Sequence, residues 1–393
     1  MTSRPSTAFF HRQTGYLLLV VTLCLITLGV VMLFSISGTR AAEGAGTATV
    51  YGALRKQAVW IVIGTVSCAL FSRIDYHRYV AKAPWVWAGS ILLLLMVFVP
   101  HLGKKVKGSW RWIEVAGMTF QPSELVKLAV VVFLSWWFAR YQRRLHSWKG
   151  MGVPVLLVLF TASILVVSKD LGTSALLFAV LTVLFFVAGA PKRYLLPLPA
   201  LALGGLLAIA WFIPERRARL FAFLHPEEFK SGKGYQNFQA LIAFGSGGTE
   251  GLGLGNSRQK MYYLPEAHTD FIFPIVGEEL GLWICLAVVL SFLVLFLCSG
   301  WISLNAPDPA GLFLGTGITT MMGLQAMINL GVVTSLLPNK GFPLPFISYG
   351  GSNLLLSMTC IGILFNLHRQ AVHPDEPVGT VLPGRKKGGP IRI

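Results

Sequence analysis

One aspartate, Asp270, stands where a polar loop gives way to a long apolar run in this 393-residue chain. The stretch that holds it, residues 260–281, reads KMYYLPEAHTDFIFPIVGEELG and places His268 two residues before the aspartate. A carboxylate is costly to hold at the edge of a membrane, so its presence there favours a functional role. The chemistry open to it is general-base catalysis, which needs a hydroxyl group within hydrogen-bond reach. The alternative is that Asp270 only caps the helix that follows.

Two further motifs place charged side chains at the ends of apolar runs. In FQPSELVK, Pro122 suits the first turn of a helix, and Glu124 and Lys127 are then spaced for an ion pair. A structural pair and a substrate-facing lysine are both open. In KDLGT, Asp170 stands at an expected helix N-cap, so capping and a role in a site are both open. No certain cofactor follows, although Mg²⁺ or Mn²⁺ stays possible, because a single aspartate is weak evidence for a metal.

Prolines and glycines interrupt the segment 331–353, GVVTSLLPNKGFPLPFISYGGSN, which also carries Ser348. Irregular backbone at membrane depth is tolerated only where it is buried in protein or lines a wet cavity. A structural re-entrant loop and a cavity wall are therefore both open. For Glu278 and Glu279 we expect a structural role, with one of them paired inside the bundle, because adjacent carboxylates point in different directions on a helix.

The elements that position these residues are predicted to be membrane helices. The chain is 54% hydrophobic and only 12% charged, with a mean hydropathy of +0.66, whereas soluble domains carry roughly a quarter charged residues. This composition excludes a soluble enzyme and predicts an all-α integral membrane protein, a bundle of about ten transmembrane helices with one large extracytoplasmic loop. The five cysteines lie in apolar runs and indicate neither disulfides nor a zinc site. The spans are expected near 16–38, 57–72, 83–101, 121–139, 152–168, 171–189, 194–213, 269–298, 310–334 and 352–368.

The chain divides into a membrane domain and two short ends. Residues 1–15 are predicted to be a cytoplasmic N-terminus, 16–368 the polytopic membrane domain, and 369–393 a basic, disordered cytoplasmic tail. The apolar run from residue 16 is interpreted as a first span rather than a signal peptide. An even number of spans places both ends on one side, and the short basic segment 139–150 makes that side cytoplasmic.

Cations gather on the predicted outer side, chiefly in the large loop at about 213–268 and in the loop that precedes Pro122. Their number suits an anionic lipid headgroup or a lipid-linked diphosphate, and nucleic acid is not an expected partner. Ordinary contact with anionic membrane lipids is the alternative. Within the large loop, Asn237–Phe244 is predicted to form an amphipathic helix at the interface. The outer cations are Lys104, Lys105, Lys107, Arg111, Arg216, Arg217, Arg219, Lys230, Lys233, Arg258 and Lys260.

Six motifs together resemble the SEDS family (shape, elongation, division and sporulation), the membrane glycosyltransferases of bacterial wall synthesis. They are KGSWRWIEV, FQPSELVKLAVVVFL, KDLGT, YQNFQALIAFGSGGTEGLGLGNSRQK, LPEAHTDFIF followed by GEELG, and KGFPLPFISYGGSN. They run in family order over about residues 16–370, and LGNSRQKMYYLPEAHTDFIF and NKGFPLPFISYGG resemble the division branch more than the elongation branch. Three positions depart from the family pattern: Lys169 replaces a frequent proline, Pro274 a small residue and Asn353 a serine.

The resemblance implies that the protein polymerises lipid II into β-1,4 glycan strands at the outer face of the membrane, during septal wall synthesis. In that inverting reaction Asp270 takes the proton of an acceptor GlcNAc 4-hydroxyl, which attacks C1 of a MurNAc linked to undecaprenyl diphosphate. Cations stabilise the departing diphosphate. The candidates are Arg111, Lys127, Arg216 and Lys260, with Glu124 orienting Lys127, and Asp170, His268 and Ser348 as further substrate-binding residues.

The resemblance also implies partners and a place in the cell. It points to a class B penicillin-binding protein transpeptidase, to other divisome proteins, and to the bacterial cytoplasmic (inner) membrane at the septum. Two other functions stay open: a lipid II flippase and a non-catalytic scaffold of the divisome. A flippase favours internal inverted repeats and charges at the midplane, whereas the polar residues of this sequence cluster at the outer ends of the spans.

Overall fold

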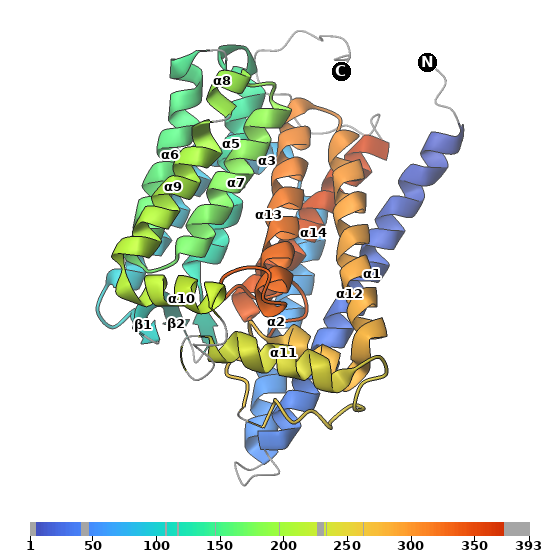
Figure 1. Cartoon of the computed structure of the whole chain (residues 1–393). Helices are drawn as coiled ribbons and strands as arrows, with labels where there is room; N and C mark the ends of the chain where they lie inside the picture. The colour runs from blue at the N-terminus through green and yellow to red at the C-terminus, as the bar shows by residue number, and fades with distance from the viewer. Residues whose placement is uncertain are drawn as a thin grey trace.

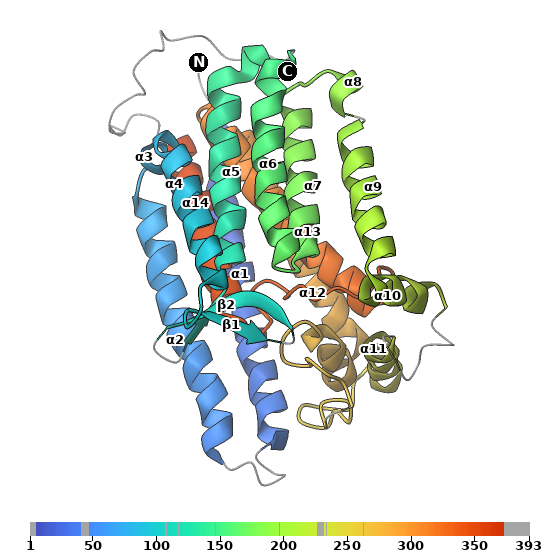
Figure 2. The same cartoon turned by 90° about the vertical axis from the view of Figure 1, so that its left-hand side faces the viewer.

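The computed structural model describes residues 5–40, 47–106, 108–115, 118–145, 147–195, 197–225, 232, 234–261 and 263–372. Lys107, Lys230, Lys233 and the predicted tail beyond residue 372 lie outside these residues. The described chain is a helical bundle with a small antiparallel sheet at one end, of strand order β1-β2-β3 (Figures 1 and 2). The elements are α1 (Pro5–Arg40), α2 (Thr47–Arg73), α3 (Tyr76–Ala81), α4 (Ala83–Leu95), β1 (Gly103–Val106), β2 (Ser109–Val115), β3 (Met118–Phe120), α5 (Pro122–Tyr141), α6 (Trp148–Val167), α7 (Leu171–Val187), α8 (Lys192–Leu195), α9 (Pro197–Phe212), α10 (Pro214–Leu224), α11 (Tyr235–Gly247), α12 (Ile272–Leu304), α13 (Pro309–Val333) and α14 (Gly351–Val372).

The predicted helical membrane bundle is confirmed, and the count of about ten spans is approximate. Within the described residues, seven helices are long and apolar enough to cross a membrane. An eighth is added if the pair Pro197–Ile209 and Pro214–Leu224, which is bent by 105°, forms one span. Two shorter apolar helices, Ala83–Phe98 and Leu171–Val187, lie where the remaining spans were predicted. Among the described residues, the departure from an all-α fold is the sheet, which occupies the predicted loop between two spans.

The two ends of the bundle differ in character. The first residues of α1 and the last of α14 lie at one end, as the even number of predicted spans requires (Figure 1). The sheet, α10 and α11 lie at the opposite end, which is called the outer end below (Figure 1). Much of the predicted large loop is therefore helical. The predicted amphipathic helix is part of α11, which buries Ala240, Ala243 and Gly247 and exposes Leu241.

The span that follows Asp270 is interrupted near its start, because α12 is broken at Gly281, where φ is 76°. The glycine-rich segment 245–255 lies against the break through its backbone. Leu252 N donates to Glu278 O over 2.9 Å, and Gly253 N donates to Glu279 O over 2.9 Å. A Cβ added at Gly281 would overlap Thr249 O. Glycine is needed here for a left-handed conformation and for close backbone contact. Asp270 thus precedes the short buried part of α12 that comes before the break.

The interior of the bundle consists mainly of α5, α13 and α14, which bury most of their side chains. Their outer halves carry the buried polar residues Lys127, Gln325, Asn329 and Asn353. Because membrane-spanning helices rarely bury so many polar groups, such residues are expected to face one another or a cavity. These four buried polar residues lie in the core, close to the outer end of the bundle.

At the opposite end, α3 joins two helices that are distant in the sequence. His77 Nε2 lies 3.0 Å from Asp308 Oδ2, and the Tyr76 hydroxyl donates to Asp308 Oδ1 over 2.7 Å. Gln370 Nε2 donates to Asp75 Oδ1 over 3.0 Å. This network holds the start of α13 and the end of α14 together.

Candidate functional site

A pocket of about 150 Å³ lies at the outer end, where β2, the starts of α5 and α7, and two loops meet. It brings together four residues that the sequence singled out, Asp270, Arg111, Glu124 and Asp170. Residues from four separate segments, spread over 159 positions of the chain, thus reach one cavity. The other lining residues are Trp112, Gln121, Thr173, Glu266, Thr269, Gly341, Phe342, Pro343, Tyr349, Gly350, Ser352 and Asn353.

Asp270 is half-buried at the end of a turn that precedes α12. Phe271, not Asp270, occupies the N-cap position of α12, so the capping alternative does not describe this structure. The turn is fixed by Thr269, whose hydroxyl donates to Glu266 Oε2 over 2.8 Å, and by Asn329, whose Nδ2 donates to the Asp270 carbonyl over 2.8 Å. Asp270 lines the pocket from this turn.

Asp170 combines a structural role with a place in the pocket. It caps α7, accepting a hydrogen bond from the Thr173 hydroxyl over 2.8 Å, as the capping prediction requires. Its Oδ1 lies 3.7 Å from Lys340 Nζ. Burial raises the pKa of Asp170, but attraction to Lys340 and Arg111 outweighs burial, and the pKa lies below its usual value. Asp170 is therefore ionised at neutral pH.

Lys340 is a cation whose role is not indicated by any of the sequence motifs. It stands directly before Gly341, which lines the pocket, in the loop 334–350 between α13 and α14, called the proline-rich loop below. Burial lowers the pKa of its amine to about 8, with repulsion from Arg111, Arg216 and Arg219 added, although Asp170 attracts the charged form. The motif KGFPLPF contains Lys340 but does not indicate its contact with Asp170. That contact exists because the fold brings this loop against the KDLGT motif.

Arg111 is held against the turn that links α6 to α7. Its guanidinium donates to the carbonyl oxygens of Ser168, over 3.4 Å, and of Lys169. Lys169 has a left-handed φ of 67°. Proline cannot adopt this conformation, because its ring fixes φ near about −65°. The departure from the family pattern at Lys169 thus accompanies a local backbone that presents two carbonyl groups to Arg111.

Lys127 lies beneath the pocket and does not line it. Its side chain is fully buried, with Nζ 2.9 Å from Glu124 Oε2 and 2.7 Å from Gln325 Oε1. Gln325 in turn donates to Asn353 Oδ1 over 2.7 Å. The ion pair that the spacing predicted is present, and Glu124, one of its two members, lines the pocket.

Lys260 lies outside the pocket. Its Nζ donates to Glu279 Oε1 over 2.6 Å and to the Ser35 hydroxyl over 2.9 Å, with the lysine and glutamate side chains fully buried. Glu278 accepts backbone hydrogen bonds from Arg258 and Gln259, over 3.0 and 3.2 Å. The predicted structural role of the two glutamates is confirmed. The structure does not bring Lys260 to Asp270, because its charge is used to hold the outer loop on α1 and α12.

The three remaining candidates lie around the pocket. Ser348 is buried, and its hydroxyl accepts from Leu344 N over 2.7 Å, so it shapes the turn between them. His268 lies beside Tyr349, with a ring-to-ring distance of 5.9 Å, and lines a neighbouring cavity. Arg216 belongs to α10 and approaches Lys340 closely enough to lower its pKa, without lining the pocket.

The pocket can therefore bring a base and an anion-binding group to one ligand. Asp270 supplies an acceptor for a hydroxyl proton. Arg111 and Lys340 supply positive charge on the side of Asp170. No group of three or more metal-binding His, Cys, Asp or Glu side chains occurs within the described ranges.

Three comparisons relate the chain to known proteins. The model of a family described as cell cycle protein, which covers FtsW, RodA and SpoVE, matches residues 16–373. A probable peptidoglycan glycosyltransferase FtsW of Geobacter metallireducens is 39% identical over 351 residues, which are 89% of this chain and 93% of the relative. Stage V sporulation protein E of Bacillus subtilis is 37% identical over 354 residues, 90% of this chain and 96% of the relative.

Solved structures share the same fold. A chain from a peptidoglycan synthase complex, solved to explain how polymerisation and crosslinking are coordinated, gives a TM-score of 0.71 at 26% identity, covering 90% of this chain and 97% of that chain. The rod shape determining protein RodA of Thermus thermophilus gives a TM-score of 0.63 at 25% identity, covering 90% and 96%. These similarities extend over nearly all of the membrane domain.

Proposed function

The chain belongs to the cell cycle protein family of FtsW, RodA and SpoVE, and on that premise we propose that it is an inverting peptidoglycan glycosyltransferase that polymerises lipid II into β-1,4 glycan strands. Relatives named as probable peptidoglycan glycosyltransferases cover about nine-tenths of the chain. The observation that carries the proposal is that Asp270 shares one outer pocket with Arg111 and Asp170. A carboxylate and cations in one pocket are what glycosyl transfer from a diphosphate requires.

Asp270 is proposed as the general base. The 4-hydroxyl of an acceptor GlcNAc donates its proton to the carboxylate while its oxygen forms a bond to C1 of the donor MurNAc. The bond from C1 to the diphosphate oxygen breaks on the opposite face, so the anomeric configuration inverts from α to β. The electron pair of the broken bond leaves with the undecaprenyl diphosphate.

Arg111 and Lys340 are proposed to stabilise the negative charge that develops on that diphosphate. Asp170 positions both, since it lies 3.7 Å from Lys340 Nζ and its pKa is lowered by both cations. Lys127 supports the pocket through Glu124 rather than by direct contact. Arg216, His268 and Ser348 then act at the edge of the site or in its framework.

The proposal extends to partners and location. One similar chain was solved within a peptidoglycan synthase complex, which supports a class B penicillin-binding protein transpeptidase as the partner here. The relatives named FtsW support work at the division septum with other divisome proteins. Both termini are proposed to lie in the cytoplasm, so that the pocket faces outward across the inner membrane.

The test is polymerisation of labelled lipid II by the purified protein together with its transpeptidase, comparing Asp270→Asn with the unmodified chain. Loss of a general base lowers the rate by about 100- to 10,000-fold, so long glycans from the unmodified chain and none from a folded variant are expected. Equal products from both would remove Asp270 as the base. Lipid II transport into vesicles without any polymer would instead indicate a flippase, and no activity of either kind would indicate a scaffold.

A further inference from the structure

Two amide side chains, Gln325 and Asn329, stand one helical turn apart in α13 and contact the two segments that carry Asp270 and Lys340. Neither belongs to the residues that line the pocket of Asp270. Both are buried, with exposed fractions of 3% and 1%. Polar side chains inside a membrane-spanning helix are costly to bury and favour a functional role. The role of these two therefore lies in what they hold.

Asn329 joins the segment 264–271, called the Asp270 turn below, to the proline-rich loop. Its Nδ2 donates to the Asp270 carbonyl over 2.8 Å and also to the Phe342 carbonyl. An amide NH₂ group carries two protons, so both hydrogen bonds can form at once. Among the described residues, no group donates to the buried Asn329 Oδ1. Because an unpaired buried acceptor destabilises a fold, the orientation of this side chain satisfies the two loops and not its own oxygen.

Gln325 holds the next residue of the proline-rich loop. Its Nε2 donates to the Pro343 carbonyl over 3.0 Å and to Asn353 Oδ1 over 2.7 Å. On its other side, Gln325 Oε1 accepts from Lys127 Nζ over 2.7 Å. An ammonium group can only donate, so Lys127 requires the amide to present its oxygen there and its nitrogen to the loop. This contact gives Lys127 a part in the site, although its side chain does not line the pocket.

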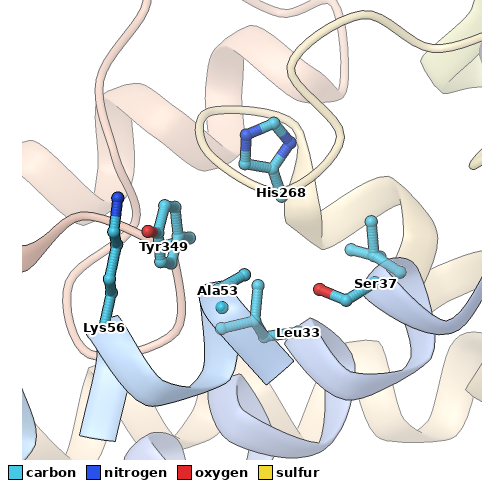
Figure 3. A pocket seen from close by; sticks show the side chains of 8 residues that line it. Leu33, Ser37, Ala53, Lys56, His268 and Tyr349 are labelled. Atoms are coloured by element: carbon cyan, nitrogen blue, oxygen red, sulfur yellow. The ribbon is translucent and has the colours of Figure 1, made fainter. Parts of the chain in front are cut away.

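The two loops have irregular backbones that need such contacts. Glu266 in the Asp270 turn has a left-handed φ of 60°, and Phe346 in the proline-rich loop has one of 66°. Left-handed backbone is unfavourable for residues other than glycine and persists only where the surroundings fix it. The loops also contact each other directly, because Tyr349 N donates to the His268 carbonyl over 2.9 Å. The side chains of these two residues lie above α1 and α2 (Figure 3).

The carbonyl groups that α13 holds stand next to the proposed reacting groups. Phe342 and Pro343 directly follow Lys340 and Gly341 in the chain. Gly341 in turn lies against the carboxylate of Asp270. A shift of the loop at Phe342 would therefore move Lys340 relative to Asp270. The proposed base and a proposed diphosphate-binding cation thus lie on two segments that α13 joins.

We propose that Asn329 and Gln325 are positioning residues that hold the base Asp270 and the cation Lys340 in one fixed arrangement, and that Lys127 orients Gln325 for this task. The inference rests on the proposed function and assigns the part of α13 in it. Loss of the two amides leaves substrate binding intact, because neither lines the pocket. It slows the chemical step, because the hydroxyl and the diphosphate no longer meet their partners together.

The first experiment removes the amide of Asn329. Asn329→Ala is expected to lower kcat on lipid II by about 100-fold, the effect of a displacement of about 1 Å in a reacting group, with the KM nearly unchanged. The matched control is Asn366→Ala in α14, which removes a buried amide that donates to the Ser72 carbonyl over 2.9 Å. It should keep the kcat of the unmodified protein. An unchanged kcat in Asn329→Ala, or an equal loss in both variants, would overturn the proposal.

The second experiment separates the two contacts of Gln325. In Gln325→Glu, the carboxylate still accepts from Lys127 but can no longer donate to the Pro343 carbonyl. If Gln325 only paired with Lys127, the added charge would leave kcat unchanged, and the part assigned to Gln325 and Lys127 would be wrong. The proposal expects a lower kcat at an unchanged KM.

A double variant tests whether Asn329 acts through the contact of Gly341 with Asp270. Because Asn329→Ala and Gly341→Ala would disturb the same arrangement, the two together should slow polymerisation much less than the product of their separate effects. Effects that multiply would show that Asn329 acts elsewhere.

The last measurement does not depend on turnover. In Asn329→Ala, hydrogen exchange followed by mass spectrometry should become about tenfold faster in the peptides that contain Phe271 and Tyr349, whereas Asn366→Ala should leave both unchanged. If the unmodified protein makes no glycan, the proposed function fails, and hydrogen exchange still decides whether Asn329 holds the two loops together. Unchanged exchange in Asn329→Ala would overturn the inference.

Discussion

The carboxylate of Asp270 lies directly against Gly341, since a Cβ added at Gly341 would overlap Asp270 Oδ2. The two residues are far apart in the sequence, yet both line the pocket described above. The proline-rich loop therefore sets the position of the proposed base by leaving room for it. A glycine is required at this point for close approach rather than for backbone conformation.

Gly341→Ala is accordingly expected to lower the polymerisation rate by about 100-fold, the size of effect that follows a displacement of about 1 Å in a reacting group. The fold should persist, because the carboxylate can turn aside. Gly245→Ala on α11, where an added Cβ meets no atom within 4 Å, is the matched control and should keep full activity. The measurement is the initial rate on lipid II, with thermal unfolding recorded for both variants. Wild-type rates in Gly341→Ala would show that Asp270 does not need its present position.

Lys340 should impose an upper pH limit on the reaction. Its pKa is lowered to about 8 by burial, so the amine is charged below pH 8 and neutral above it. If the charged form stabilises the diphosphate, kcat should fall as pH rises through about 8. Lys340→Arg, whose side chain stays charged throughout, should keep its rate up to pH 9. A pH profile unchanged by this substitution would exclude Lys340 from the leaving-group site.

Part of this site follows from local sequence, and part only from the fold. The capping of α7 by Asp170 and the ion pair of Glu124 with Lys127 depend on residues three positions apart, and spacing predicts both. Lys340 next to Asp170, and Gly341 against Asp270, join segments from different spans. No local pattern encodes such a contact. The break of α12 was missed for the same reason, because Gly281, where φ is 76°, lies against the backbone of Thr249 and Gly251 from the preceding loop.

The pair of Lys260 and Glu279 is expected to support the fold rather than the chemistry. Both side chains are fully buried, so removing one partner leaves a buried charge alone, which costs about 3–5 kcal/mol. Glu279→Gln should therefore lower the unfolding temperature in detergent markedly. The double variant Lys260→Met with Glu279→Leu should recover much of it, because no lone charge remains. Equal unfolding temperatures for Glu279→Gln and the unmodified protein would show that the pair is not needed.

The cluster of His77 at the other end should make stability depend on pH. Burial alone would lower the pKa of His77, but hydrogen bonds to Asp308 and Asp75 raise it to about 9, against about 6.5 in an unfolded chain. A raised pKa means that the stabilisation is complete below about pH 6.5 and is lost as pH rises through 9. Imidazolium is the form that can donate from both ring nitrogens, to Asp75 and to Asp308. The unfolding temperature should thus fall between about pH 6.5 and 9.5. The variant His77→Gln should reduce that fall. The control His225→Gln, at an exposed position, should leave it unchanged. If the unfolding temperature of His77→Gln keeps its full dependence on pH, a titratable group other than His77 is responsible for that dependence.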